Sequence, residues 1–219
     1  MTISLIKRLF IYNLGMLILA FGTAFTINSD LGVSPVSSLP FILSEVSGFN
    51  IGLMSAAFFG VLVLLQIIIL GKNFKWINLI QLPFAFIFGY FLDFARWVLG
   101  TIQFPTYFGR LGMLIIGIIL IAMGIVFLIL ARIIIMPPEA LCQALSQRFP
   151  RIKFHIAKIV MDCAIVAISI TISLSFLGNL EGIREGTVIS AIAIGKIIPY
   201  IKKILEPIAN KIIPHRLSD

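Results

Sequence analysis

The chain has few of the residues from which catalytic and metal sites are usually built. Only 12% of its 219 residues are charged, and it has two cysteines and two histidines. Two cysteines provide neither a disulfide framework nor the ligand spacing of a zinc site. The sequence also has no GxxxxGK[ST] phosphate loop, no HExxH motif and no serine nucleophile elbow. We therefore expect no enzyme and no cofactor, and no transport driven by ATP hydrolysis within this chain.

Apolar residues, in contrast, make up 60% of the sequence, which is typical of an integral membrane protein. A hydrocarbon core about 30 Å thick requires roughly 20 apolar residues per helix. We expect an all-α membrane protein with little chain left for a soluble domain. The sequence predicts six transmembrane helices, at about 8–27, 51–71, 76–98, 110–132, 155–177 and 186–201.

The 17 basic residues outnumber the nine acidic residues and gather at one set of helix ends. The opposite ends carry only three, Arg96, Arg110 and Arg184, among five acidic residues. This bias follows the positive-inside rule, so we expect both termini in the cytoplasm. It explains the net charge of +8 through contact with membrane lipids, without a nucleic-acid partner. The basic set is Lys7, Arg8, Lys72, Lys75, Arg132, Arg148, Arg151, Lys153, Lys158, Lys202, Lys203, Lys211 and Arg216.

The sequence repeats itself without a gap at an offset of 102 residues, with nine identities where 14–45 is aligned with 116–147. Three helices per copy is an odd number, so the second copy must enter the membrane upside down relative to the first. We expect two inverted three-helix repeats, 1–105 and 106–201, and then a basic interfacial tail over 202–219. The identical pairs are Gly15/Gly117, Ala20/Ala122, Gly22/Gly124, Phe25/Phe127, Ile27/Ile129, Pro35/Pro137, Leu39/Leu141, Leu43/Leu145 and Ser44/Ser146.

Each copy contains a short polar segment that begins with proline. Ser34 is a suitable N-cap, Pro35 suits the first helical position, and Gly48 suits the end of a helix. The second segment begins at Pro137 and places Glu139 in its first turn. Both segments predict helices of about 12–14 residues, which are too short to span a bilayer. They can lie flat at the interface or enter the membrane as half-helices whose N-termini face a central cavity, and the sequence leaves both placements open.

Asp162 is the least expected residue of the predicted fifth helix. It lies about 10 Å along the helix axis, where an unpaired acid costs about 2.5–3.5 kcal/mol. Lys158 lies one turn earlier on the same face, and Glu139 belongs to the same cytoplasmic half. A structural ion pair and a substrate or proton site both explain these residues. The candidate binding residues are Ser34, Pro35, Ser37, Ser38, Pro137, Glu139, Lys158 and Asp162.

Other polar residues are secondary candidates with ordinary structural explanations. Asp93 precedes Arg96 by three residues near the outer end of the third helix, as in a solvated interfacial pair. Arg184 and Glu185 open the sixth helix, and glutamate is an ordinary first-turn residue. A lysine within that helix can extend its amine to the cytoplasmic interface. The secondary candidates are Gln81, Asp93, Arg184, Glu185 and Lys196.

Three sequence runs are distinctive: LGVSPVSSLP at 31–40, MPPEAL at 136–141 and GIREGT at 182–187. They resemble the YczE/YyaS/YitT family of bacterial inner-membrane proteins. The resemblance covers roughly residues 10–200 and is strongest to the YczE/YyaS branch. It implies a multi-pass helical protein of the bacterial cytoplasmic membrane, and it supplies no ligand residues. Pro138 departs from the family, in which glycine is expected after the first proline, so this helix start is stiffer.

The leading hypothesis is a secondary transporter or channel-like facilitator for a small polar or anionic solute, because inverted repeats and a deep acid are typical of transporters. The alternative is an accessory or regulatory membrane protein, or an energy-less substrate-binding subunit that acts through a partner. The small residues Ala20 and Ala24 would then provide the docking face. Expected partners are membrane lipids, an unidentified small polar solute, and a second copy or a membrane partner protein.

Overall fold

The computed structural model describes residues 2–212, and side chains over 5–207. This part of the chain contains α-helices and no β-strand. Two 3₁₀ turns, Gly71–Asn73 and Trp76–Ile80, join α3 to α4, and a π turn at Ser173–Leu177 extends α7. The helices are α1 (Thr2–Asn28), α2 (Pro35–Ser47), α3 (Ile51–Leu70), α4 (Gln81–Leu99), α5 (Tyr107–Ala131), α6 (Pro137–Arg148), α7 (Phe154–Ile172) and α8 (Glu185–Ile212).

The all-α expectation is confirmed, and the first five predicted spans are found. The helices long and apolar enough to cross a membrane are Leu5–Asn28, Ile51–Asn73, Trp76–Leu99, Tyr107–Ala131 and Phe154–Leu177. The sixth predicted span, 186–201, lies within α8, which does not qualify over its described residues. The six-span architecture therefore stays a prediction.

The predicted tail is not separate from that last helix. α8 continues without a break through residue 201 to Ile212, and includes Lys202 and Lys203. Residues 213–219, the remainder of the predicted tail, lie outside the described residues. A basic helical end at the membrane interface is consistent with this geometry.

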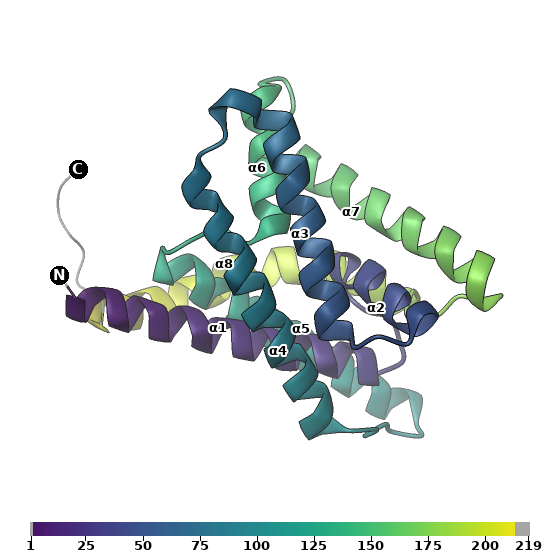
Figure 1. Ribbon diagram of the computed structural model, residues 1–219. Coiled ribbons are helices and arrows are strands. Elements are labelled where there is room, and N and C mark those ends of the chain that lie inside the picture. The colour runs from purple at the N-terminus through teal and green to yellow at the C-terminus, as the bar shows by residue number, and fades with distance from the viewer. Residues whose placement is uncertain (1, 213–219) are drawn as a thin grey trace.

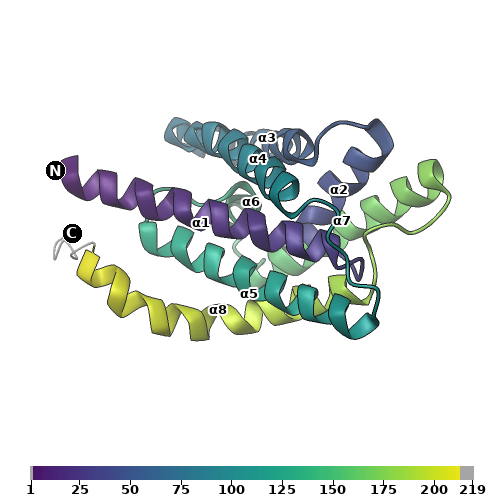
Figure 2. The same cartoon turned by 90° about the horizontal axis from the view of Figure 1, so that it is seen from below.

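The long helices run alternately in opposite directions (Figures 1 and 2). The start of α1, the α3–α4 connection, the α6–α7 connection and the end of α8 lie toward one end of the molecule. The α4–α5 and α7–α8 connections lie toward the other end (Figure 1). The ends with most basic residues therefore gather on one side, as the positive-inside bias requires.

α1 and α5 pack closely through two pairs of glycines. A Cβ added to Gly15 would lie 3.1 Å from the Gly124 carbonyl oxygen, and one added to Gly22 would lie 2.8 Å from that of Gly117. The aligned pairs in the sequence are Gly15/Gly117 and Gly22/Gly124, so the aligned residues exchange partners. Reciprocal contacts of this kind are those that a two-fold axis produces.

The ends of α1 and α5 also match. Asp30 and Arg132, which are equivalent at the 102-residue offset, both have a φ of 52°. This left-handed conformation is uncommon for residues other than glycine, and it turns the chain sharply after each helix. The short helices then begin at Pro35 and Pro137, again 102 residues apart.

α2 and α6 begin in the protein interior and end at its surface. Pro35 and Ser38 at the start of α2, and Pro137 and Ala140 at the start of α6, are buried. α3 is the third helix of the first half, and α7 is the third helix of the second. Both short helices, α2 and α6, pack against both of these helices. The short helices therefore connect the two halves.

The resemblance between the halves breaks down at the last helix pair. α4 packs along α3 where Gly52 and Gly89 meet backbone to backbone, and Gly52 N–H donates to Asp93 Oδ1 at 2.8 Å. His155 takes the place of Gly52 as the second residue of α7, so α7 lacks the small residue at which α3 and α4 meet. α8 packs on α5, with no comparable packing on α7 among the described residues.

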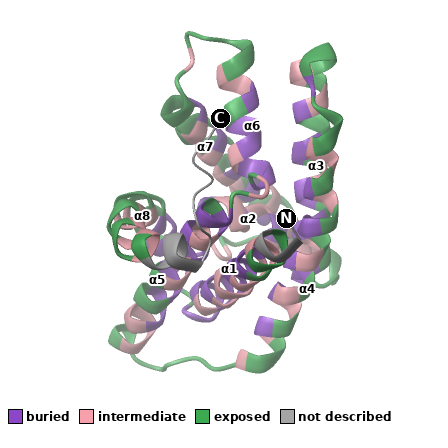
Figure 3. Ribbon diagram, turned by 90° about the vertical axis from the view of Figure 1, so that its left-hand side faces the viewer, coloured by how far each residue is buried: buried purple, intermediate pink, exposed green. Residues whose placement is uncertain are grey.

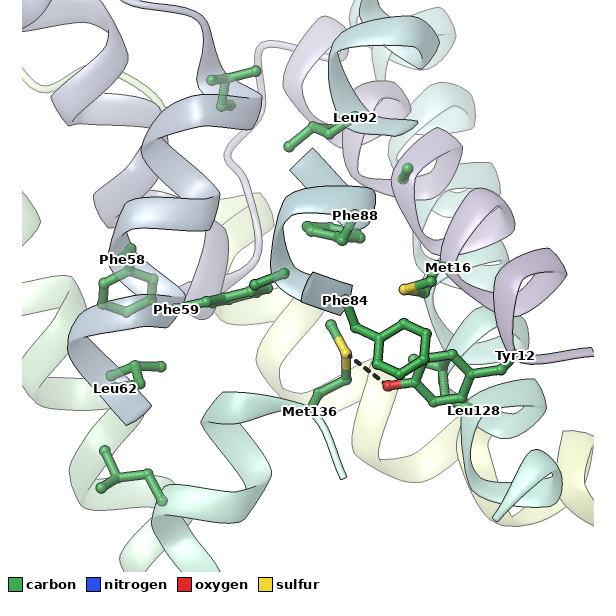
Figure 4. Packing of buried hydrophobic residues seen from close by; sticks show 14 of the residues in the cluster. Tyr12, Met16, Phe58, Phe59, Leu62, Phe84, Phe88, Leu92, Leu128 and Met136 are labelled. Carbon is green, nitrogen blue, oxygen red and sulfur yellow. Dashed lines mark hydrogen bonds between the residues drawn. The ribbon is translucent and has the colours of Figure 1, made fainter. Parts of the chain in front are cut away.

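The apolar core lies where α1, α3, α4 and α5 meet. Phe59 and Phe88 stack with ring centroids 5.6 Å apart, and Tyr12 packs on Phe84 with centroids 4.7 Å apart (Figure 4). The Tyr12 hydroxyl donates to the Met136 sulfur at 3.5 Å, just before α6 begins (Figure 4). Exposed residues follow the outward faces of α3, α7 and α8 (Figure 3), as expected where lipid replaces water.

Candidate functional site

Lys158 of α7 lies between two carboxylates. Its amine donates to Asp162 Oδ1 at 3.0 Å and lies 3.9 Å from Glu139 Oε1 of α6. The three side chains are partly buried, with exposed fractions of 29% for Lys158, 21% for Asp162 and 34% for Glu139. We call these three residues the Lys158 cluster. These three residues, on two different helices, thus lie together in the structure.

The backbone explains why these groups meet. Lys158 and Asp162 are one helical turn apart, so they share a face of α7. That face packs on α6, whose first turn carries Glu139. Negative charge in this first turn is stabilised by the positive end of the helix dipole. With both acids ionised, the cluster has a formal charge of −1, which favours a proton or another cation over an anion.

The start of α6 is fixed by a pair of buried amides. Gln66 and Gln81 exchange two hydrogen bonds of 3.2 Å across α3 and α4, and Gln66 Nε2 also donates to the Pro137 carbonyl at 3.3 Å. The secondary candidate Gln81 is therefore a support for the start of α6. It lies in the same region as Pro137 but makes no bond to the Lys158 cluster.

The start of α2 has an equivalent set of hydroxyls. Ser34 occupies the N-cap position, as predicted, but its hydroxyl bonds to that of Ser37 at 2.9 Å and caps no backbone N–H. Ser38 donates to the Pro35 carbonyl at 2.7 Å and shares a 3.0 Å bond with Ser169 of α7. The four candidates of the first Pro-led segment thus lie together, apart from the Lys158 cluster.

Two of the sequence runs that carry the family resemblance lie against each other. Val33 N–H donates to the Gly182 carbonyl at 2.9 Å, and Gly186 N–H donates to the Leu31 carbonyl at 2.7 Å. The secondary candidate Arg184 donates to the backbone oxygen of Asp30 at 2.7 Å. These bonds attach the α1–α2 linker to the start of α8.

An exposed ion cluster covers this junction. The Asp30 carboxylate lies 2.9 Å from Arg110 and 3.3 Å from Arg184. In the first two turns of α8, the hydroxyls of Thr187 and Ser190 are buried and have no hydrogen-bond partner among the described residues. Such groups are rare in protein interiors, and an unpaired buried hydroxyl is unfavourable.

The remaining secondary candidates stand apart from these groups. Asp93 caps the start of α3 through Gly52 and forms no ion pair with Arg96, so the predicted interfacial pair is wrong. Glu185 is the exposed first residue of α8, and Lys196 is exposed farther along that helix.

The expected docking face on α1 is also wrong. Ala20 and Ala24 are completely buried in the core of the chain, so no partner can reach them. Their small side chains serve close packing within this protein.

Sequence reasoning missed several of these contacts. Ser169 and Asp30 each pair with residues more than a hundred positions away, and serine or aspartate alone gives no sign of a distant partner. Equivalent positions in the two copies offer one signal by which such contacts could have been predicted. Gln66 and Ser169 are both the sixteenth residue of their helices, α3 and α7, and each bonds near the proline start of the short helix of the opposite half.

Comparison with known proteins agrees with the resemblance seen in the sequence. The chain is 32% identical over 114 residues to the uncharacterized protein YyaS of Bacillus subtilis (strain 168), a match that covers 52% of this chain. The match spans 55% of the length of YyaS. No solved structure matches the chain. The profile of a family of unknown function, DUF6198, matches residues 6–203, and the chain therefore belongs to that family.

Proposed function

We propose that this protein is a secondary transporter of the bacterial cytoplasmic membrane that moves a small polar solute together with a proton. The observation that carries the proposal is the Lys158 cluster, in which one lysine on a spanning helix is held between acids of α6 and α7. Ionisable groups inside a membrane are costly, so they are retained mainly where they act.

The architecture we propose is an inverted repeat, with α1–α4 as one half and α5–α8 as the other. The reciprocal glycine contacts of α1 and α5 support a two-fold relation, and the alternating helix directions support an inverted second half. α8 would then be the sixth span, and both termini would be cytoplasmic. Transporters built in this way bind their solutes where the two repeats meet.

In the proposed architecture, α2 and α6 are half-helices that enter the membrane from opposite sides. Their buried starts support this placement over the interfacial one, since a helix lying on the surface would expose one face along its whole length. Each start carries the positive end of a helix dipole, which suits polar groups of a solute, although Pro35, Pro137 and Pro138 have no N–H to donate. The path of the solute would then be lined by Ser34, Ser37 and Ser38 at the start of α2, and by Pro137 and Gln81 at the start of α6.

The coupling step follows from the geometry of the Lys158 cluster. The 3.0 Å bond to Asp162 stays within α7, whereas the 3.9 Å contact with Glu139 joins α7 to α6. Protonation of Glu139 removes the charge that attracts Lys158, so α6 can move relative to α7 while the bond within α7 remains. A proton thereby changes the position of the helix start that faces the solute.

Reconstituted protein tests whether transport occurs at all. Proteoliposomes on a solid-supported membrane are exposed to amino acids, sugars, carboxylates and inorganic phosphate under an imposed pH gradient. We expect a current with one class of solute, reduced at least tenfold in Glu139→Gln. The matched control is Cys163→Ser, an exposed change on α7, which should carry the wild-type current.

The accessory-protein alternative gives a different result. Absence of both current and internal pH change with every solute, together with a stoichiometric partner purified from native membranes, would favour the alternative and reject the transporter.

A further inference from the structure

A second polar region lies at the end of the molecule opposite the α6–α7 connection (Figure 1). It is a cleft of about 460 Å³ between the C-terminal half of α2, the α2–α3 turn, the start of α3 and the end of α4. Sites for small molecules usually have volumes of about 300–1,000 Å³. The chemically distinctive lining residues are Phe41, Glu45, Phe49, Asp93, Arg96 and Trp97.

The charged groups of this cleft do not neutralise one another. Glu45 forms no ion pair within the described chain, and Asp93 Oδ1 accepts only the Gly52 N–H. Arg96 Nη1 donates to Asn28 Oδ1 at 3.3 Å and so is turned toward α1. Two carboxylates and one guanidinium give the cleft a formal charge of −1, which attracts cations.

The other walls are aromatic. Trp97 and Phe49 are 78% and 59% exposed as whole residues, and Phe41 lies against Gly182. Aromatic faces attract cations through the negative charge above the ring, and tryptophan does so best. Aromatic rings beside unneutralised carboxylates are the surroundings in which quaternary ammonium groups are bound.

We propose that this cleft binds a small organic cation with an alkylated ammonium head group. The carboxylate of Glu45 supplies the charge, Trp97 and Phe49 supply the ring faces, and Asp93 fixes the floor of the cleft through its bond to α3. The proposal does not depend on transport, because none of these residues contacts the Lys158 cluster. Binding here and flux through the protein can therefore fail separately.

The chain provides its own reporter, since Trp76 and Trp97 are its two tryptophans. In a Trp76→Phe variant purified in an uncharged detergent, Trp97 is the only indole. The probe is N-methylpyridinium, a quaternary cation that quenches indole fluorescence on contact. We expect quenching that saturates, is reversed by choline, and is not reversed by 3,3-dimethylbutan-1-ol, the uncharged isostere of choline.

Two charge variants in the Trp76→Phe background decide where the cation sits. Glu45→Gln should weaken apparent binding about fivefold, the effect of losing one partly exposed ion pair. Glu181→Gln removes an equal charge from outside the cleft and should leave binding unchanged. Quenching that rises linearly with concentration, and equally in both variants, would overturn the proposal and leave Trp97 as an interfacial anchor.

Discussion

Gly22 of α1 lies so close to Gly117 of α5 that a Cβ added to Gly22 would be 2.8 Å from the Gly117 carbonyl oxygen. Gly15 and Gly124, which are aligned in the sequence with Gly117 and Gly22, make the same kind of contact with the roles of the two helices exchanged. Backbone contact of this kind lets two membrane helices pack without large side chains between them. The interface between the two halves therefore depends on glycine at these positions.

Leucine in place of Gly22 should force α1 and α5 apart. Overpacking typically costs about 1–3 kcal/mol, which lowers the midpoint of thermal unfolding by about 2–12 °C in a chain of this size. The control is Gly112→Leu on α5, because a Cβ there meets nothing within 4 Å. Equal unfolding midpoints for the two variants in detergent would show that the glycine contact does not hold the halves together.

The buried amide pair should behave as a unit. Gln66→Leu leaves the Gln81 amide without its partner, at an expected cost of about 1–3 kcal/mol. The double change to leucine should cost less than the sum of the two single changes, since no unpaired amide then remains. A double-mutant cycle of unfolding free energies measures this coupling, and strict additivity would contradict it.

Thr187→Val tests the unpaired hydroxyl at the start of α8. A buried hydroxyl without a partner is unfavourable, so a side chain of the same shape should leave stability equal or higher. Thr26→Val is the contrasting control, because Thr26 donates to the Thr23 carbonyl at 2.8 Å and should lose about 1 kcal/mol. A loss of more than about 1 kcal/mol in Thr187→Val would mean that a bound water or ligand satisfies the hydroxyl.

Labelling of single cysteines tests the inverted orientation of the halves. Exposed positions are Thr101 in the α4–α5 connection and Asn179 in the α7–α8 connection at one end, and Lys72 in the α3–α4 connection and Arg151 in the α6–α7 connection at the other. In a background without Cys142 and Cys163, an impermeant maleimide should label the first two in intact cells. It should label the other two only after permeabilisation. Labelling of Thr101 and Lys72 from the same side would exclude the inverted repeat.

Much of the fold could be predicted because it depends on local chemistry. Apolar length predicts the first five spans, and proline at the first helical position predicts where the short helices start. Lys158 and Asp162 could be paired in advance because helical spacing places them on one face.

The remaining features depend on contacts between distant segments. Small residues predict a close contact without identifying the partner helix, so Ala20 and Ala24 were assigned to the wrong interface. The pairing of Ser38 with Ser169 and of Asp30 with Arg184 arises only once the halves are packed together. The α3–α4 type of packing is not repeated at α7, where His155 stands in the position of Gly52, and the weak alignment of this region does not show this difference.

The most direct test of the proposed coupling is the accumulation of the identified solute by proteoliposomes under an inward proton gradient. Asp162→Asn leaves Lys158 with Glu139 as its one acidic neighbour among the described residues, and so should strengthen the contact between α7 and α6 that must open. We predict that wild-type protein accumulates the solute above its external concentration, whereas Asp162→Asn does not accumulate it at equal reconstitution. Accumulation by Asp162→Asn equal to that of the wild type would contradict the proposed coupling.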